Sequence, residues 1–125
     1  MDNLITVITR FQLPAGVTAD QIRAAFDEAA PGFRNVPGSV RKQFLRSKDC
    51  RTAGGVYLWS DERVARAFMN EHVAPMIREK FHVDPAIEFY DSPVIVENCM
   101  WIGGKWGQIY IIDISSLTYR SFASS

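Results

Sequence analysis

The sequence has few of the residues that cross-links and metal sites require. Its 125 residues include two cysteines, Cys50 and Cys99, and two histidines. The two cysteines form no metal-binding spacing and no disulfide framework. One disulfide and two free thiols are both compatible with the sequence, and we predict free thiols in a reducing cytoplasm. The histidines and scattered carboxylates form no recognisable ligand set, so we predict no metal.

Charge of one sign and long apolar runs are also lacking. The chain has 14 basic and 14 acidic residues and a formal net charge of zero, so we expect neither nucleic acid nor a membrane as a partner. No apolar run reaches the roughly 18 to 20 residues of a membrane helix. The beginning of the chain has an acidic second residue and no long apolar core, which does not resemble a signal peptide. We therefore predict a soluble, cytoplasmic protein.

Several catalytic motifs are absent from the sequence. It has no GxGxxG, no phosphate-binding P-loop, no HExxH and no GxSxG. This argues against nucleotide binding, zinc proteolysis and hydrolysis by a serine triad.

Alternating and helical patterns divide most of the chain into six elements. Strands are predicted where β-branched and aromatic residues cluster or alternate with polar ones, and helices where apolar residues recur at i, i+3, i+4 and i+7 behind a capping residue. The strands are 4–13, 39–48, 54–59 and 86–96. The first helix is capped by Thr18 and is stopped by Pro31-Gly32, and the second helix is 61–80, with a break at Pro75. Pro93 marks an irregular or edge position in the last strand.

The order of these elements predicts the fold. Strand, helix, strand, strand, helix, strand is the ferredoxin-like βαββαβ arrangement, an α+β fold with a four-stranded antiparallel sheet and both helices on one face. Apolar residues on the other face need a cover, and a second copy of the sheet would provide one. We therefore predict a homodimer.

The chain divides into a ferredoxin-like domain, residues 1–98, and a C-terminal extension, residues 99–125. The extension contains GQIYIIDISS, a candidate hairpin, and ends in a polar, serine-rich segment. Three interpretations remain open: an arm that pairs with a partner subunit, an extra strand on the main sheet, or sequence foreign to the domain.

The second helix and the strand before it contain the most suggestive chemistry. At about 100° per residue, one helix stripe collects six residues: Val64, Ala65, Phe68, Met69, His72 and Met76. His72 is thus predicted on an apolar inner face, either as a general base or as an inert core histidine. Trp59 is a candidate stacking wall, and Tyr57 a candidate hydrogen-bond donor, with aromatic core packing as the alternative for both. Lys42 and Tyr90 are weaker candidates for binding a substrate.

Part of the chain resembles a known family. The matching segments are Pro37–Phe44 (PGSVRKQF), Ala53–Ser60 (AGGVYLWS), Ala65 with Ala67 and Phe68, and Tyr90–Asn98 (YDSPVIVEN). They resemble the YdhR-like branch of the antibiotic-biosynthesis-type monooxygenases, in the dimeric α+β-barrel superfamily. With the first strand and helix, the resemblance spans Leu4 to Asn98.

The resemblance implies an architecture and an activity. The architecture is a homodimer whose sheets form a barrel, with a pocket between sheet and helices in each subunit. The activity is oxidation of an aromatic or polyketide-like molecule by O₂ without metal or flavin, in which His72 and Tyr57 would be catalytic. Trp59, Lys42, Phe68 and Tyr90 would bind the substrate. The alternatives are a non-oxidative cyclase or lyase, a haem-degrading enzyme, and a non-enzymatic dimer that binds a small apolar ligand.

Overall fold

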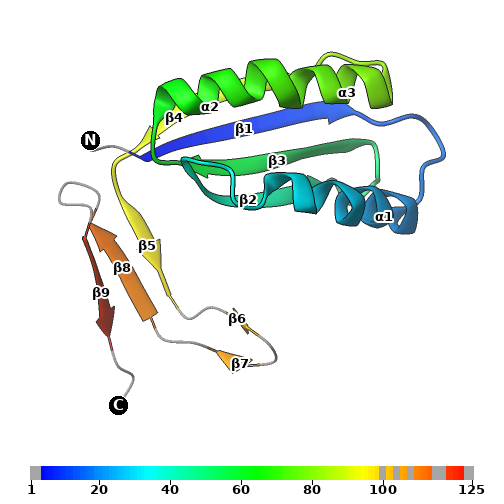
Figure 1. The fold of residues 1–125 in the computed structure, drawn as a ribbon. Coiled ribbons are helices and arrows are strands. Elements are labelled where there is room, and N and C mark those ends of the chain that lie inside the picture. The colour runs from blue at the N-terminus through cyan, green and yellow to red at the C-terminus, as the bar shows by residue number, and fades with distance from the viewer. Residues whose placement is uncertain (1–3, 99–100, 103–104, 107–108, 114–117, 123–125) are drawn as a thin grey trace.

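A computed structural model describes the chain except residues 1–3, 99–100, 103–104, 107–108, 114–117 and 123–125, with side chains described for residues 4–98. One four-stranded antiparallel sheet dominates it, in the order β2-β3-β1-β4. Its strands are β1 (Leu4–Gln12), β2 (Ser39–Arg46), β3 (Thr52–Trp59) and β4 (Ala86–Ser92). The helices α1 (Ala19–Ala29), α2 (Glu62–Phe68) and α3 (Ala74–Phe81) cover one face of this sheet (Figure 1). The predicted ferredoxin-like fold is confirmed.

Strand β1 lies in the centre of the sheet because both of its faces are largely apolar. It pairs with β3 on one side, where Val7 lies opposite Tyr57, and with β4 on the other, where Val7 lies opposite Phe89. The main core lies between the sheet and the helices. Its buried residues are Ile5, Val7, Tyr57, Trp59, Ala65, Met69, Val73 and Ile77.

The first helix begins where the sequence predicts, after Thr18, but it ends at Ala29, before the predicted stop at Pro31-Gly32. Thr18 Oγ1 accepts a hydrogen bond from the Gln21 backbone at 3.1 Å, and the Gln21 side chain accepts one from the Thr18 backbone at 3.0 Å, completing the capping box. A 3₁₀ turn, Ala30–Phe33, follows α1 and contains Pro31. Phe33 at its end packs against the main core.

Helices α2 and α3 are joined by a π-helical turn, Met69–Val73. The Ala74 N–H donates to the Met69 carbonyl, five residues back, where an α-helix would bond four residues back. Pro75 follows directly. A proline ring clashes with the carbonyl four residues before it, and the wider π turn relieves this clash without ending the helix. The predicted irregularity is therefore present, as a widened turn.

The fourth strand is shorter than predicted. It ends at Ser92 because Pro93 cannot donate a ladder hydrogen bond, so the predicted continuation to Val96 is wrong. Instead β5 (Ile95–Glu97) pairs with β8 (Ile109–Asp113), which pairs with β9 (Thr118–Phe122). The short strands β6 (Trp101–Ile102) and β7 (Lys105–Trp106) pair with each other.

The C-terminal extension forms the predicted hairpin, β8–β9, but not as a strand of the main sheet. Among the described residues, no strand after Ser92 pairs with β2-β3-β1-β4. Figure 1 shows β8 and β9 beside β5, apart from the four-stranded sheet and its helices. The interpretation of this segment as an arm for a partner subunit stays a prediction, as does the domain boundary at residue 98. Cys99, one of the two cysteines predicted to be free, lies outside the described residues.

No helix in the described part of the chain combines the length and apolar character needed to cross a bilayer.

Candidate functional site

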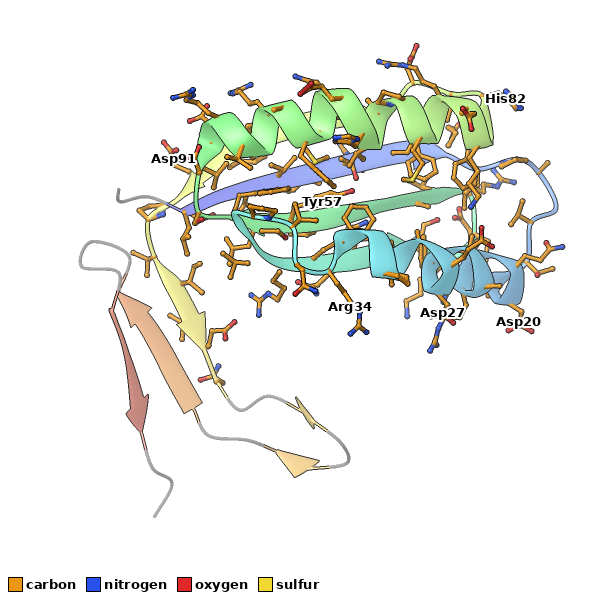
Figure 2. The ribbon with its side chains drawn as sticks, in the orientation of Figure 1. Asp20, Asp27, Arg34, Tyr57, His82 and Asp91 are labelled. Atoms are coloured by element: carbon orange, nitrogen blue, oxygen red, sulfur yellow. The ribbon has the colours of Figure 1, made fainter. Side chains whose placement is uncertain are left out.

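A mostly apolar cavity lies between the sheet and the two helical segments. Strands β1, β2 and β3 form its floor, and α1 and α3 form its walls. It is lined by Thr9, Phe11, Ala25, Phe26, Ala29, Lys42, Phe44, Gly54, Tyr57, Met76, Ile77, Lys80 and Phe81. The volume of the cavity is about 50 Å³. Figure 2 shows Tyr57, on the floor, in the gap between α1 and the α2–α3 helix.

Lys42 is the cationic group on the floor of this cavity, and aromatic rings surround its ammonium group. Lys42 Nζ lies 3.5 Å from the ring centre of Phe44, 4.1 Å from that of Phe33 and 4.6 Å from that of Tyr57. Among residues 4–98, no carboxylate lies within ion-pair distance of this nitrogen. Burial lowers the pKa of Lys42 from 10.5 to about 7, because removal from water disfavours the charged form.

Gly55 provides the room for the Lys42 side chain. A Cβ at Gly55 would lie 3.0 Å from Lys42 Cε and 3.2 Å from Lys42 Nζ. The aliphatic part of the Lys42 side chain therefore lies over Gly55 of β3, where the neighbouring strand has no side chain. Phe44, two residues along β2, faces the same way and lies opposite Gly55.

Tyr57 and Thr9 add two hydroxyl groups to the cavity. Burial raises the pKa of Tyr57 to about 12, so the phenol stays protonated at neutral pH, and the neighbouring Thr9 hydroxyl opposes this shift in part. Thr9 is only 1% exposed, yet its Oγ1 makes no hydrogen bond of normal geometry with the described residues. An unpaired buried hydroxyl is costly, so Thr9 Oγ1 is available to a bound molecule.

The mouth of the cavity lies between α1 and α3. Lys80 of α3 and Glu28 of α1 form an ion pair of 3.7 Å that joins the two helices. Both side chains are largely exposed, so this pair holds the mouth only weakly. Met76, which is 40% exposed, is a flexible lining residue at the same wall. The cavity is small, and a ligand of several rings would need these helices to separate.

The structure brings two of the predicted site residues, Lys42 and Tyr57, directly together. They lie opposite each other in the β2–β3 pair, and both line the cavity. Trp59 and Phe68 lie in the adjoining core, with ring centres 5.4 Å apart. Trp59 is fully buried and its Nε1 has no partner among the described residues. Neither residue lines the cavity.

His72 does not lie on the inner face of its helix, so its predicted burial is wrong. Its side chain is exposed and stacks on the outside of Phe68, with ring centres 5.2 Å apart. The π turn is the reason, because one extra residue per turn moves Val73 into the inward position that regular spacing assigns to His72. The inward residues are Ala65, Met69, Val73 and Ile77, each four apart, while Val64 and Met76 are exposed.

Tyr90 lies on the opposite face of the sheet. It pairs with Thr6, whose side chain points away from the helices, and it is 49% exposed. Tyr90 therefore has no access to the cavity between the sheet and the helices.

Thr9, Phe33 and Phe44 lie at the site but are not among the site residues predicted from the sequence. Thr9 had a signal, as the one hydroxyl on the inner face of β1 beside Ile5, Val7 and Phe11. Phe44 had one too, since it lies two residues after Lys42 and therefore on the same face of β2. Phe33 reaches Lys42 through the 3₁₀ turn after α1, which no pattern in the sequence specifies.

Solved structures with a similar fold include three informative ones. A protein of unknown function from Nitrosomonas europaea, NE2512, has a TM-score of 0.60 and 18% identity, with 72% of this chain and 89% of that chain covered. SnoaB, a cofactor-independent oxygenase from Streptomyces nogalater, has a TM-score of 0.55 and 17% identity, with 72% and 93% covered. The monooxygenase ActVA-Orf6 of Streptomyces coelicolor, in complex with nanaomycin D, has a TM-score of 0.53 and 19% identity, with 73% and 88% covered. At such identities, the likeness establishes the fold.

A search of curated proteins finds no match to this chain. A family model described as "Putative mono-oxygenase ydhR" matches residues 8–85, which include β1 from Ile8 onward, α1, β2, β3 and the whole α2–α3 helix. The match covers more than half of the chain and every residue that lines the cavity. The chain therefore belongs to the YdhR family of mono-oxygenase-like proteins.

Proposed function

We propose that this protein is a cofactor-independent monooxygenase that oxidises an aromatic or polyketide-like small molecule with O₂. One observation carries the proposal: a buried amine, Lys42, lies with the hydroxyls of Tyr57 and Thr9 in a cavity otherwise lined mainly by apolar side chains. Membership of the YdhR family and the fold shared with SnoaB support it. The cytoplasmic location predicted from the sequence is part of this proposal.

The reaction needs a substrate that supplies its own electrons. A methylene group activated by a neighbouring carbonyl or aromatic ring loses a proton to a base and becomes a carbanion. The carbanion reduces O₂ and forms a carbon–oxygen bond, giving a hydroperoxide that loses water. The balance is R₂CH₂ + O₂ → R₂C=O + H₂O, so no external reductant is consumed. An apolar, water-poor pocket protects the carbanion from simple reprotonation by solvent.

The proposed roles follow from the positions of the side chains. The protonated Tyr57 donates a hydrogen bond to the substrate oxygen that gains charge as the carbanion forms. Trp59 and Phe68 pack behind Tyr57 and hold the floor and wall in place. Two groups can act as the base: His72, proposed from the sequence, and Lys42, which lies inside the cavity.

Oxygen uptake tests this proposal and separates the two bases. Anthrone and 1,3-indandione, which both contain an acidic methylene group, serve as substrates in an oxygen electrode, with product identified by mass spectrometry. We expect the wild-type protein to take up oxygen faster than the uncatalysed reaction. The rate of oxygen uptake should fall about 100-fold or more in Lys42→Met and should change little in His72→Ala. The rate of oxygen uptake should fall about 10- to 100-fold in Tyr57→Phe, because this change removes a single hydrogen-bond donor.

Two outcomes would contradict the proposal or part of it. Conversion of substrate without oxygen uptake would favour the cyclase or lyase alternative, and binding without any product would favour a ligand-binding dimer. Loss of activity in His72→Ala with full activity in Lys42→Met would return the role of base to His72, as the sequence alone predicts.

The proposal includes a homodimer formed through the outer face of the sheet. Leu4, Ile8, Val56 and Leu58 give this face an apolar strip, and Leu45 extends it on β2. Ile95 of β5 covers the end of the strip at Leu4 and Leu58. A second copy would cover the rest, where Tyr90 is also placed, and would supply the barrel implied by the resemblance.

Light scattering on matched variants tests the homodimer. Leu45 and Val64 are both 37% exposed, but Leu45 lies on the outer face of the sheet and Val64 on α2. We expect the wild-type chain and Val64→Glu to have twice the monomer mass of 14.1 kDa, and Leu45→Glu to be monomeric. A dimer in Leu45→Glu would exclude this face as the interface, and a monomeric wild type would exclude the homodimer.

A further inference from the structure

The cavity contains a buried amine, Lys42, for which residues 4–98 supply no anionic partner. We infer that Lys42 is the proton acceptor and counter-ion for an acidic hydroxyl group on an aromatic or enolic ligand. This rests on the proposed function only for the expectation that the cavity binds an oxidisable aromatic molecule. The inference assigns one residue a role and restricts the ligand to phenols and enols.

The surroundings of Lys42 Nζ are the first line of support. Three ring faces lie within 4.6 Å of it, and such faces attract a cation. A buried ammonium group normally also has a carboxylate partner, and none of the described residues provides one. The protonated Lys42 therefore obtains an anionic partner only from a bound ligand that carries or acquires negative charge.

Two further groups suit an oxygen anion. Thr9 Oγ1 is buried beside the Tyr57 hydroxyl in the cavity lining and makes no hydrogen bond of normal geometry with the described residues, so it can donate its proton to a ligand. Tyr57 keeps its proton at neutral pH because burial raises its pKa to about 12. An oxygen anion accepts strong hydrogen bonds from such donors. The amine and the two hydroxyls thus provide complementary contacts for a phenolate or enolate oxygen.

The apolar lining favours a ligand that enters uncharged. A carboxylate or phosphate would lose its hydration shell on entry, at high cost among Phe11, Phe26 and Phe81. A phenol or enol enters neutral and becomes charged only inside. The ligand O–H bond breaks, a bond between its proton and Lys42 Nζ forms, and the products are a phenolate and an ammonium ion. No oxidant or reductant takes part in this step.

Few other titratable groups face Lys42. β1 contributes the neutral Thr9, β3 contributes Tyr57, and α1 contributes Ala25, Phe26 and Ala29. From α3, Lys80 lines the cavity at its mouth and pairs with Glu28 of α1. Lys80 is therefore the one other lysine among the described lining residues, and the test has to separate it from Lys42.

Titration of bound 4-nitrophenol tests the inference. Its anion is yellow, so absorbance reports the ionised fraction directly, and under nitrogen no oxygenation can occur. We expect the wild-type protein to lower the apparent pKa of the bound phenol by about one unit or more, a tenfold change in the ratio of anion to neutral form. In Lys42→Met the apolar pocket should raise that pKa instead and suppress the yellow band.

Control variants make the result specific. Lys42→Gln gives a second neutral side chain in case the methionine variant does not fold. Lys80→Met should change the ionisation much less than Lys42→Met, and Lys48→Met, in the exposed loop after β2, should behave as wild type. Three results would each overturn the inference. They are unchanged ionisation of bound 4-nitrophenol in both Lys42 variants, a change in ionisation only in Lys80→Met, and no saturable binding of 4-nitrophenol by the folded wild-type protein. Failure of oxygen uptake would leave this titration interpretable, so the two proposals can fail separately.

Discussion

We expect Gly54→Ala to destabilise the protein more than the same replacement at Gly55, the other glycine of the four-stranded sheet. A Cβ at Gly54 would lie 1.9 Å from the Thr9 carbonyl oxygen and 2.8 Å from the Thr9 carbonyl carbon. Both are backbone atoms of β1, the central strand, and they cannot move without disturbing its pairing with β4 as well. We expect a loss of at least about 3 kcal/mol in the free energy of unfolding.

Urea denaturation followed by tryptophan fluorescence measures this loss. Two other glycines provide matched controls. At Gly32, in the 3₁₀ turn, a Cβ would meet nothing within 4 Å, so Gly32→Ala should be close to neutral. At Gly55 a Cβ would meet the flexible end of Lys42 and, at 3.1 Å, the Gln43 carbonyl oxygen. Because these distances are much longer than those at Gly54, Gly55→Ala should be milder than Gly54→Ala but should disturb 4-nitrophenol binding. Wild-type stability in Gly54→Ala would show that β1 and β3 lie farther apart at this point than the structure has them.

The sequence specifies the fold of residues 4–92 through local signals that agree with one another. Alternation places Ile5 and Val7 on the inner face, Thr18 and Gln21 cap α1, and Asp61 caps α2 by accepting from Val64 N at 3.1 Å. These signals depend on neighbouring residues in the chain, so they can be identified without the tertiary structure. The end of β4 also has a local signal, Pro93, because proline cannot donate a hydrogen bond to the sheet. The prediction treated Pro93 as an irregularity inside the strand, whereas the strand ends at Ser92.

The candidate site was less predictable because it depends on small departures from regular geometry. His72 was assigned to the inner face by assuming about 100° per residue, and one π turn transferred that position to Val73. The four-residue spacing of Ala65, Met69, Val73 and Ile77, together with Pro75, was the available clue. The sequence predicts Lys42 as a solvated charge at the edge of the sheet. Nothing in β2 alone shows that Gly55, which has no side chain, leaves room for the Lys42 side chain beside Tyr57 and Phe44.

Lys42 and Tyr57 should together give the protein a stability maximum near pH 10. In the unfolded chain Lys42 keeps its proton up to its usual pKa of 10.5, whereas in the folded protein burial lowers that pKa to about 7. Between these values the unfolded state binds more protons, so the free energy of unfolding rises with pH. The size of the pKa shift sets an upper limit of about 5 kcal/mol for this rise, and attraction between the ammonium and the ring faces reduces it.

Tyr57 acts in the opposite direction at higher pH. Its pKa is 10.0 when unfolded and about 12 when folded, so above pH 10 the folded state binds the extra proton. Stability therefore falls as the pH rises through this range. The two buried groups favour the fold in their uncharged forms, the amine of Lys42 and the phenol of Tyr57, and both are uncharged near pH 9 to 10.

Urea denaturation across this pH range, compared between variants, isolates each contribution. Lys42→Met should be more stable than the wild type near pH 7 and should lose most of the rise between pH 7 and pH 10, while keeping the fall above it. Tyr57→Phe should keep the rise and lose the fall. Because the other lysines and tyrosines are common to all three proteins, the differences report these two groups alone. If the free energy of unfolding rose as much between pH 7 and pH 10 in Lys42→Met as in the wild type, the Lys42 ammonium would have to be solvated in the folded protein. A solvated ammonium group would not require an anionic group from a ligand.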